Sequence, residues 1–260
     1  YLYFKQSKCS SYQCAQSRIW KINPDTYSAS PVSYSSACFN YGQVGLANMG
    51  DTETLICSWA EQNFSETSSR YAFLDVISPV SRIPFPFNPS PGYGLAFDPL
   101  TQTIYSIQNS AFRSITFDGV TTNLANFPAG SGHGLAWGQG GVFAVSNNSN
   151  DLYFYDPLAD SWEIRGTINS GIQGGTGGPG LAYRPDTDKL YAIRASSNHP
   201  LLMIDPNTGE SSIVANLGSL DQSCSWYGGG LAWISADCNE NGIADHLDVL
   251  AGAEDCNGNS

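Results

Sequence analysis

The sequence predicts an all-β fold, a five-bladed β-propeller closed by its N- and C-terminal strands and followed by a short calcium-loop segment. Three observations lead to this prediction. The tripeptide Gly-Leu-Ala recurs five times, at intervals of 40 to 50 residues. Short apolar runs separated by turn residues fill each interval. Glycine occurs 27 times in 260 residues and only 13% of residues are charged, a composition typical of short strands and turns.

The five copies of the tripeptide mark the innermost strand that we expect in each blade. They begin at Gly45, Gly94, Gly134, Gly180 and Gly230. An aromatic residue follows four of the copies, whereas Asn48 follows the first. These aromatic residues are Phe97, Trp137, Tyr183 and Trp233. Because they continue the inner strand in register, we expect Trp137, Tyr183 and Trp233 to be buried in the core.

The fourth copy shows the remaining strands of a blade most clearly. It predicts strands at 180–183, 190–193, 201–204 and 212–215, with turns at 184–188 and 205–209. Other copies predict second strands at 103–107 and 141–145, and third strands at 18–24 and 152–157. Four strands in a repeat of 40 to 50 residues is the size of a propeller blade. The alternative is a β-sandwich with accidental internal similarity.

The two ends of the chain complement each other. The last copy contains only an inner strand, 230–233, whereas the N-terminus begins with an expected second strand at 2–4 and continues with a third and a fourth. Joined in one sheet, the two ends would complete the fifth blade and leave fewer open strand edges. We therefore predict a propeller domain over residues 1–235 and a calcium-binding tail over residues 236–260.

The charge of the chain excludes two classes of partner. The net charge is −12, and the 11 Lys and Arg residues do not cluster. Nucleic acids and anionic membranes both attract clustered basic side chains, so we expect neither as a partner. No apolar run reaches the roughly 18 residues of a transmembrane helix. An acidic surface favours divalent cations instead.

The tail contains a predicted calcium site. Residues 237–248 fit a twelve-position calcium loop, with Gly242 where the backbone must turn sharply. Asp stands at the last position, where an EF-hand has Glu, so this carboxylate could bind through one oxygen only. The alternative is a solvated acidic tail without metal. The expected ligands are Asp237, Asn239, Asn241, the carbonyl of Ile243, Asp245 and Asp248, and a weaker second loop begins with Asp255, Asn257 and Asn259.

The seven cysteines lack the paired spacing of a structural zinc site. Disulfides formed in an oxidising compartment explain them better than buried thiols in a cytosolic protein, which is the alternative. Our pairing leaves Cys224 over, so that either this thiol is free or one pair is wrong. The candidate pairs are Cys9 with Cys14, Cys38 with Cys57, and Cys238 with Cys256.

Both parts of the chain resemble known repeats. The pattern GLAY-turn-LYAI…LLxIDPxTG is similar to that of bacterial extracellular five-bladed propellers and covers residues 1–235. Residues 237–260 resemble the dockerin-type and thrombospondin-type-3-like calcium repeats of bacterial surface proteins, where Asp at the last loop position is common. These resemblances imply a secreted or cell-surface protein that binds Ca²⁺. They imply a fold rather than an activity, because propellers serve many functions.

The expected central channel offers little catalytic chemistry. Glycosidases on such folds use paired carboxylates, but the expected inner strands hold no Asp or Glu, and Asp98, Asp51 and Glu53 have no matching second carboxylate nearby. No nucleophile elbow, phosphate-binding loop or redox motif is present either. A His before one inner strand could bind a ligand or form a hydrogen-bonded wall. The residues expected at this channel mouth are Val44, Tyr93, His133, Pro179 and Gly229.

The sequence favours a non-enzymatic extracellular structural or binding protein, a rigid propeller with a calcium-stabilised tail. The tail could join one molecule to the next in a fibre or matrix, or attach the propeller to a separate surface receptor. The alternatives are a polysaccharide hydrolase or lyase and a lectin-like carbohydrate binder. Convergent carboxylates at the channel mouth would favour the enzyme. Exposed aromatic side chains at equivalent blade positions would favour the lectin.

Overall fold

The computed structural model of the chain is an all-β propeller, as the repeats predict. The residues it describes are 1–10, 13–35, 45–49, 54–63, 66–75, 82–84, 94–108, 110–130, 132–172, 179–194, 198–218 and 230–234. The predicted calcium-loop segment lies outside them. No helix of the described part is long and apolar enough to cross a membrane.

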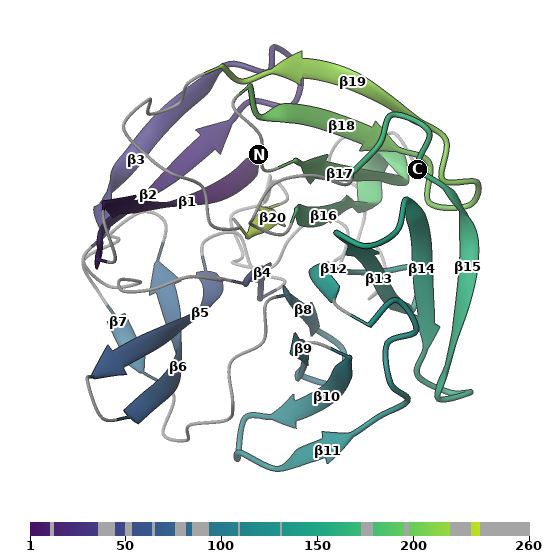
Figure 1. Cartoon of the computed structure of the whole chain (residues 1–260), viewed down its shortest axis with the longest axis horizontal. Helices are drawn as coiled ribbons and strands as arrows, with labels where there is room; N and C mark the ends of the chain where they lie inside the picture. The colour runs from purple at the N-terminus through teal and green to yellow at the C-terminus, as the bar shows by residue number, and fades with distance from the viewer. Residues whose placement is uncertain are drawn as a thin grey trace, which may run out of the picture.

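The described strands form five four-stranded antiparallel sheets around a common centre (Figure 1). In four of them, consecutive strands run from the centre outwards. One sheet contains β4 (Leu46–Asn48), β5 (Thr54–Asn63), β6 (Glu66–Asp75) and β7 (Arg82–Pro84). The next contains β8 (Gly94–Asp98), β9 (Thr103–Gln108), β10 (Ala111–Thr116) and β11 (Thr121–Asn123). The third contains β12 (Gly132–Gly138), β13 (Gly141–Ser146), β14 (Asp151–Asp156) and β15 (Ser161–Thr167). The fourth contains β16 (Gly180–Arg184), the 3₁₀ turn η2 (Pro185–Thr187), β17 (Lys189–Ile193), β18 (Pro200–Ile204) and β19 (Ser211–Asn216).

The remaining sheet, called the closing sheet below, combines the two ends of the chain. It contains β20 (Leu231–Trp233), β1 (Leu2–Ser10), β2 (Gln13–Ile22) and β3 (Ala29–Ser35). Leu2 pairs with Trp233, and Phe4 pairs with Leu231. The backbone N–H of Ile234 donates to the carbonyl of Tyr1 at 2.9 Å. The prediction that the two ends share one sheet is therefore confirmed.

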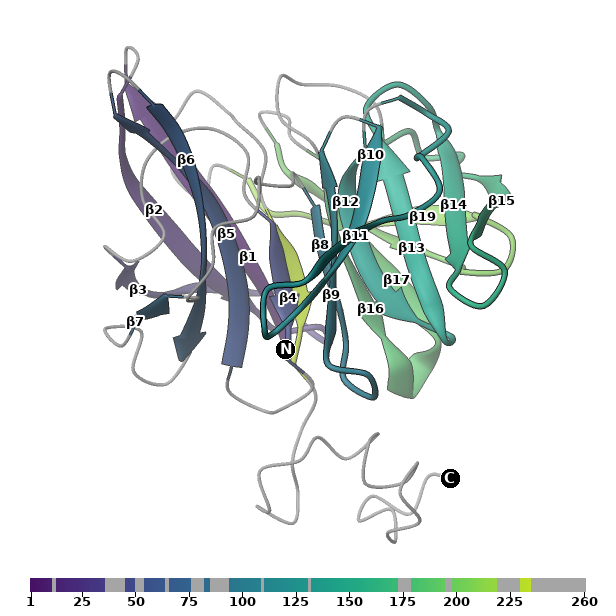
Figure 2. The same ribbon diagram turned by 90° about the horizontal axis from the view of Figure 1, so that it is seen from below.

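Close approach of the inner strands explains the glycine of the repeat. The strands β4, β8, β12, β16 and β20 contact one another in a ring, and Figure 2 shows β4 and β20 side by side. A Cβ on Gly45 would lie 2.4 Å from Cγ of Leu95, and a Cβ on Gly230 would lie 2.4 Å from Cβ of Leu46. Carbon atoms cannot pack so closely, so any larger residue at these two positions would push neighbouring sheets apart.

The apolar core lies between the sheets. Each pair of neighbouring sheets shares one buried cluster, so that five clusters follow one another around the ring. Between the closing sheet and its neighbour, for example, Tyr3 and Ile19 pack with Leu46 and Leu55. The inner strands are short continuous apolar runs because both faces of each sheet are covered by another sheet.

The turns between the third and fourth strands use one chemistry three times. Asn23, Asp156 and Asp205 each precede a proline and begin a turn. Their Oδ1 atoms accept a hydrogen bond from the backbone N–H two residues further on, at 2.8, 2.8 and 2.9 Å respectively. Asn and Asp stabilise turns in this way, so each Asx-Pro pair marks the turn between the third and fourth strands of its sheet.

Two strands are longer than predicted. The expected strands at 2–4 and 18–24 belong to β1 and β2. The structure extends β1 to Ser10 and begins β2 at Gln13, so that the two strands form a long hairpin. Apolar residues that mark a blade are rare in this stretch, which is mostly polar between residues 5 and 18. A periodic pattern therefore gives no signal for the extension.

Candidate functional site

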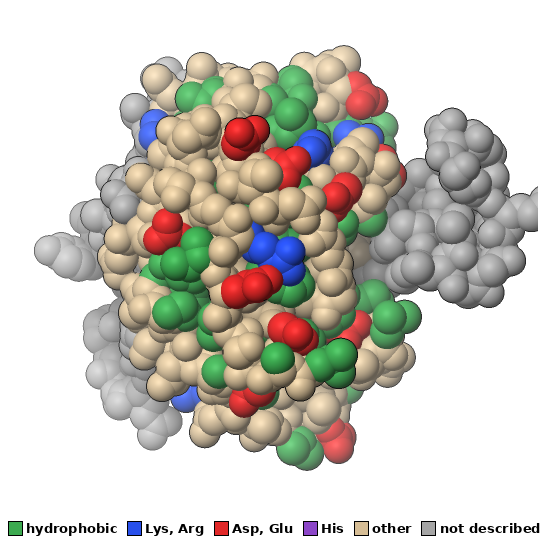
Figure 3. Space-filling model, turned by 90° about the vertical axis from the view of Figure 1, so that its right-hand side faces the viewer, with side chains coloured by type: hydrophobic (Ala, Val, Ile, Leu, Met, Phe, Trp, Pro, Cys, Tyr) green, Lys and Arg blue, Asp and Glu red, His purple; other side chains and the backbone are tan. Residues whose placement is uncertain are grey.

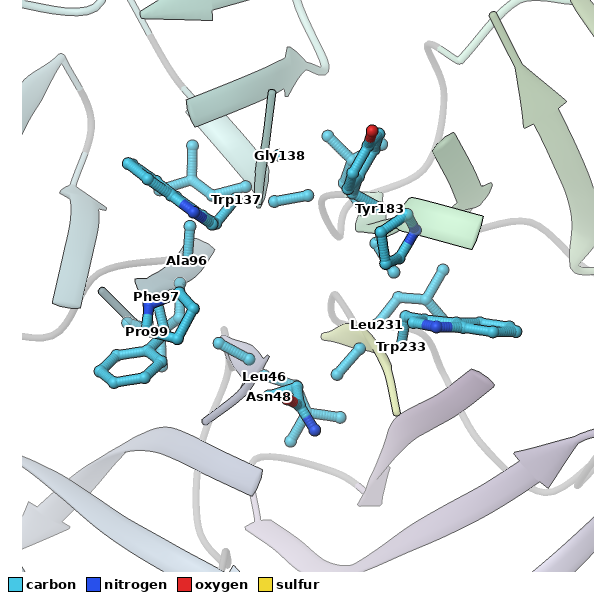
Figure 4. Close-up of a pocket in the computed structure, with 18 of the residues that line it drawn as sticks. Leu46, Asn48, Ala96, Phe97, Pro99, Trp137, Gly138, Tyr183, Leu231 and Trp233 are labelled. Atoms are coloured by element: carbon cyan, nitrogen blue, oxygen red, sulfur yellow. The ribbon is translucent and has the colours of Figure 1, made fainter. Parts of the chain in front are cut away.

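The centre of the ring holds a cavity of about 420 Å³. The five Leu-Ala pairs of the repeats line it, together with the residue that follows each pair (Figure 4). Turn residues after three of the inner strands complete the wall, namely Pro99, Leu100, Gln139, Gly140 and Pro185. The cavity is thus built by the repeat itself and reaches the face of the ring on which the inner strands end.

The aromatic residues of the repeat pack between neighbouring sheets. Trp137 stacks on Tyr105 of the preceding sheet, with ring centroids 5.6 Å apart and an interplanar angle of 9°. Tyr183 stacks on Phe143 in the same way, at 5.9 Å and 21°. Figure 4 shows the rings at these places pointing away from the middle of the opening. They fasten the sheets to each other and present only part of their surface to the cavity.

Burial of these side chains is less complete than the sequence predicts. Phe97 is buried, at 4% exposed, but Trp137, Tyr183 and Trp233 are half-buried. The guanidinium of Arg184 lies over the ring of Trp233 at 4.6 Å from its centroid. The prediction of full core burial is wrong in degree, because the last residue of an inner strand lies where the sheet borders the cavity.

Asn48 occupies the one place where the repeat lacks an aromatic residue. The sheet that precedes β4 in the ring is the closing sheet. In it Tyr3 pairs with Ala232, just as Tyr105, on which Trp137 stacks, pairs with Ala96 in its own sheet. Burial raises the pKa of Tyr3 to about 12, so its phenol is neutral at physiological pH. The wall of the cavity therefore carries an amide at this point of the ring in place of an aromatic face.

Two further polar side chains of the wall bind a carboxylate outside it. Nε2 of Gln139 and the hydroxyl of Tyr183 both donate to Oδ1 of Asp188, each at 2.8 Å. Burial and this hydrogen bond raise the pKa of Tyr183, so the hydroxyl remains a donor at neutral pH. Among the described residues that line the cavity, none is Asp, Glu, Lys, Arg or His.

Leu100 stands at the mouth of the cavity with 75% of its surface exposed. The buried Asp98 fixes the turn that carries it. Oδ1 of Asp98 accepts the backbone N–H of Leu100 at 2.9 Å, and the hydroxyl of Thr101 donates to Oδ2. Asp98 is the carboxylate nearest to the predicted inner strands, and in the structure it serves this turn.

The predicted calcium ligands lie outside the described residues, because both loops fall within 237–259. Where the chain is described, no group of three or more His, Cys, Asp and Glu could hold a metal ion. The calcium site therefore stays a prediction.

The predicted disulfides are only partly within the described structure. Cys9 and Cys14 face each other as Cα partners near the end of the β1–β2 hairpin, but their side chains are outside it. Cys57 is disulfide-bonded. Its pairing with Cys38 stays a prediction, because Cys38 lies outside the described residues. The same holds for Cys224 and for the pair of Cys238 with Cys256.

The channel mouth that the sequence singled out is at the other end of the inner strands. Pro179 is buried there, and its carbonyl oxygen would lie 2.7 Å from a Cβ on Gly134. His133 belongs to β12, although its side chain is outside the described part, as are Val44, Tyr93 and Gly229. The cavity instead involves the turns after the inner strands. The signal for them was the aromatic residue, followed within two residues by Pro or Gly, after the second, third and fourth Gly-Leu-Ala.

His199 is a buried histidine at the junction with the closing sheet. It is 1% exposed, and its ring centroid lies 6.3 Å from that of Phe4 in β1. Burial lowers its pKa from 6.5 to about 4. At neutral pH this imidazole is therefore uncharged and forms part of the packing between two sheets.

Comparisons with known proteins extend only to the fold. No protein-family model matches the sequence, and no curated protein matches it either. A chain in the crystal structure of a nidogen/laminin complex is similar, with a TM-score of 0.56 at 12% identity over 91% of this chain and 100% of that chain. A structural genomics protein of unknown function from Bacteroides thetaiotaomicron gives a TM-score of 0.49 at 12% identity, over 81% of this chain and 64% of that chain. At 12% identity the first likeness shows a shared propeller fold alone.

Proposed function

We propose that this protein is a non-enzymatic extracellular structural or binding protein, in which a rigid propeller presents fixed surfaces and a calcium-stabilised tail connects it to a partner. The observation that carries the proposal is the continuous packing between sheets. Five buried clusters and the stacked rings of Trp137 and Tyr183 join each sheet to the next. A ring packed in this way keeps its outer surface in one shape, as a scaffold requires.

Hydrogen bonds at the outer rim add to this rigidity. The backbone N–H of Ser211 donates to Oδ1 of Asn169 at 2.8 Å, which joins the sheets of β15 and β19. Nε1 of Trp162 donates to the carbonyl of Ala125 at 2.9 Å, which joins the sheets of β11 and β15. Figure 3 shows acidic side chains spread over one side wall of the molecule without gathering in a single patch. Such a surface suits a protein that stays dispersed until a specific contact is made.

The tail supplies the specific contact in this proposal. It follows Ile234, which pairs with Tyr1 on the face where the inner strands end. The first calcium loop would order the tail, which could then bind a neighbouring molecule. A contact between two different patches continues into a fibre unless it closes. The disulfide at Cys57 supports an oxidising, extracellular setting.

Light scattering of the purified chain in Ca²⁺ and then in EGTA tests this function. We expect the mean mass to grow with protein concentration in Ca²⁺ and to return to the monomer in EGTA. The variants Asp237→Ala and Asp248→Ala should remain monomeric in both, whereas Asp25→Ala, which removes an exposed carboxylate of the propeller, should behave like the wild type.

One result would narrow the proposal and another would contradict it. A monomer in both conditions at high concentration would remove self-assembly and leave attachment to a separate receptor. Release of new sugar ends from polysaccharides, at a rate proportional to the concentration of protein, would replace the scaffold by an enzyme.

A further inference from the structure

We propose that the central cavity is a binding site for an uncharged, mainly apolar small molecule, which enters past Leu100. This goes beyond the scaffold function, which requires no ligand at the centre of the ring. The volume of about 420 Å³ is the first reason. It falls in the range of roughly 300–1,000 Å³ that is typical of sites for small molecules.

The charge of the walls selects against ions. The chain carries 23 acidic and 11 basic residues, yet none of those that the structure describes lines the cavity. An ionic ligand would lose its hydration on entry and find no oppositely charged side chain in return. An uncharged molecule avoids this cost.

The polar groups of the wall favour an apolar molecule over a sugar. Gln139 and Tyr183 already donate to Asp188, so one N–H of Gln139 and the hydroxyl proton of Tyr183 are occupied. The other polar groups of the described wall are few, namely the amides of Asn48 and Gln139 and the backbone groups of the inner strands, each of which is an end member of its sheet. A sugar carries hydroxyl groups on every side, and several would stay unpaired. A ring compound with one or two polar groups leaves none unpaired.

The aromatic side chains give such a molecule its contacts. Trp137 and Trp233 are half-buried and line the cavity from different sheets, and Leu100 extends the apolar surface to the mouth. Aromatic and aliphatic side chains bind ring compounds through buried apolar area and edge or stacked contacts. The two indoles also make binding visible, because they can transfer excitation energy to a bound fluorophore.

Two fluorescent probes of similar shape test the proposal. N-phenyl-1-naphthylamine is uncharged, whereas 8-anilinonaphthalene-1-sulfonate carries one negative charge on comparable rings. In titrations of the wild-type chain we expect saturable binding of the uncharged probe to one site, at least tenfold tighter than binding of the anion. Tryptophan emission should fall in step with the rise in probe emission.

A pair of matched variants places the site. Leu100→Arg puts a charge at the mouth, and Leu158→Arg makes the same change at a leucine that is 99% exposed and does not line the cavity. Leu100→Arg should weaken binding of the uncharged probe at least fivefold, and Leu158→Arg should change it less than twofold. Both leucines are exposed, so neither change should unfold the protein, which circular dichroism can verify.

Several results would overturn the proposal. Absence of saturable binding would remove the site, and equal weakening by both variants would place it elsewhere. Binding of the anionic probe at least as tight as that of the neutral one would contradict the selection against charge. Displacement of the neutral probe by millimolar oligosaccharide would assign the cavity to sugars instead.

Discussion

The indole of Trp137 lies almost parallel to the phenol ring of Tyr105, with centroids 5.6 Å apart, and the two residues belong to neighbouring sheets. Tyr183 and Phe143 repeat this contact one sheet further on. The inner strand therefore has two tasks. Its Leu and Ala residues line the cavity, and the residue that follows them fastens its sheet to the preceding one.

Removing this contact should destabilise the ring. We expect Trp137→Ala to lower the free energy of unfolding by about 2–3 kcal/mol, below the roughly 3–5 kcal/mol of a fully buried aromatic residue, because Trp137 is half-buried. Urea unfolding followed by circular dichroism measures this. Leu158→Ala, at a side chain that is 99% exposed, should stay within about 0.5 kcal/mol of the wild type. Equal effects of the two changes would show that the stack does not join the sheets.

Adding one methyl group at Gly45 should also be costly. Its Cβ would lie 2.4 Å from Cγ of Leu95 and 2.9 Å from the backbone nitrogen of the same residue. We expect Gly45→Ala to cost about 1–3 kcal/mol, as overpacking of a core does. In a Leu95→Ala background the additional cost should shrink, because part of the clash is gone. Purely additive effects in the unfolding data would argue against contact between these inner strands.

Burial of His199 predicts a specific loss of stability in weak acid. Burial lowers its pKa from 6.5 to about 4, so the unfolded chain takes up a proton at higher pH than the folded one. The contribution of neutral His199 is fully present above about pH 6.5 and is lost as the pH falls toward 4, by about 2 kcal/mol between pH 7 and pH 5. The variant His199→Asn, which tolerates the positive φ of 41°, should lack this slope. Urea unfolding at both pH values compares the two chains, and parallel pH dependences would refute the assignment.

Repetition made most of the fold predictable. Five copies of Gly-Leu-Ala fixed the inner strands, and the strands predicted at 180–183, 190–193, 201–204 and 212–215 match β16 to β19 to within one residue at each end. The missing strands of the last copy predicted the closing sheet, in which Leu2 pairs with Trp233. Short apolar runs bounded by turns carry this information because both faces of every sheet pack on another sheet.

The site was less predictable, for physical reasons. A repeat shows which residues are equivalent, but not at which end of the inner strands a cavity widens. Attention to His133 pointed to the start of the inner strands, whereas the described lining of the cavity includes turns at their ends, and Leu100 in such a turn carried no pattern of its own. The half-burial of Trp137 was missed as well. The register predicts on which face of its sheet a side chain lies, but not how far the neighbouring sheet extends over that side chain.

Closure by the two ends of the chain is the central structural claim, since both the rigid ring and the enclosed cavity depend on it. Hydrogen exchange of the segment 230–234 in the intact chain and in a chain that lacks residues 1–8 tests it most directly. In the intact chain the Ile234 amide donates to Tyr1, so we expect slow exchange there. The shortened chain should exchange this segment at rates near those of an unfolded peptide and melt at a lower temperature. Unchanged protection and an unchanged melting temperature in the shortened chain would contradict closure.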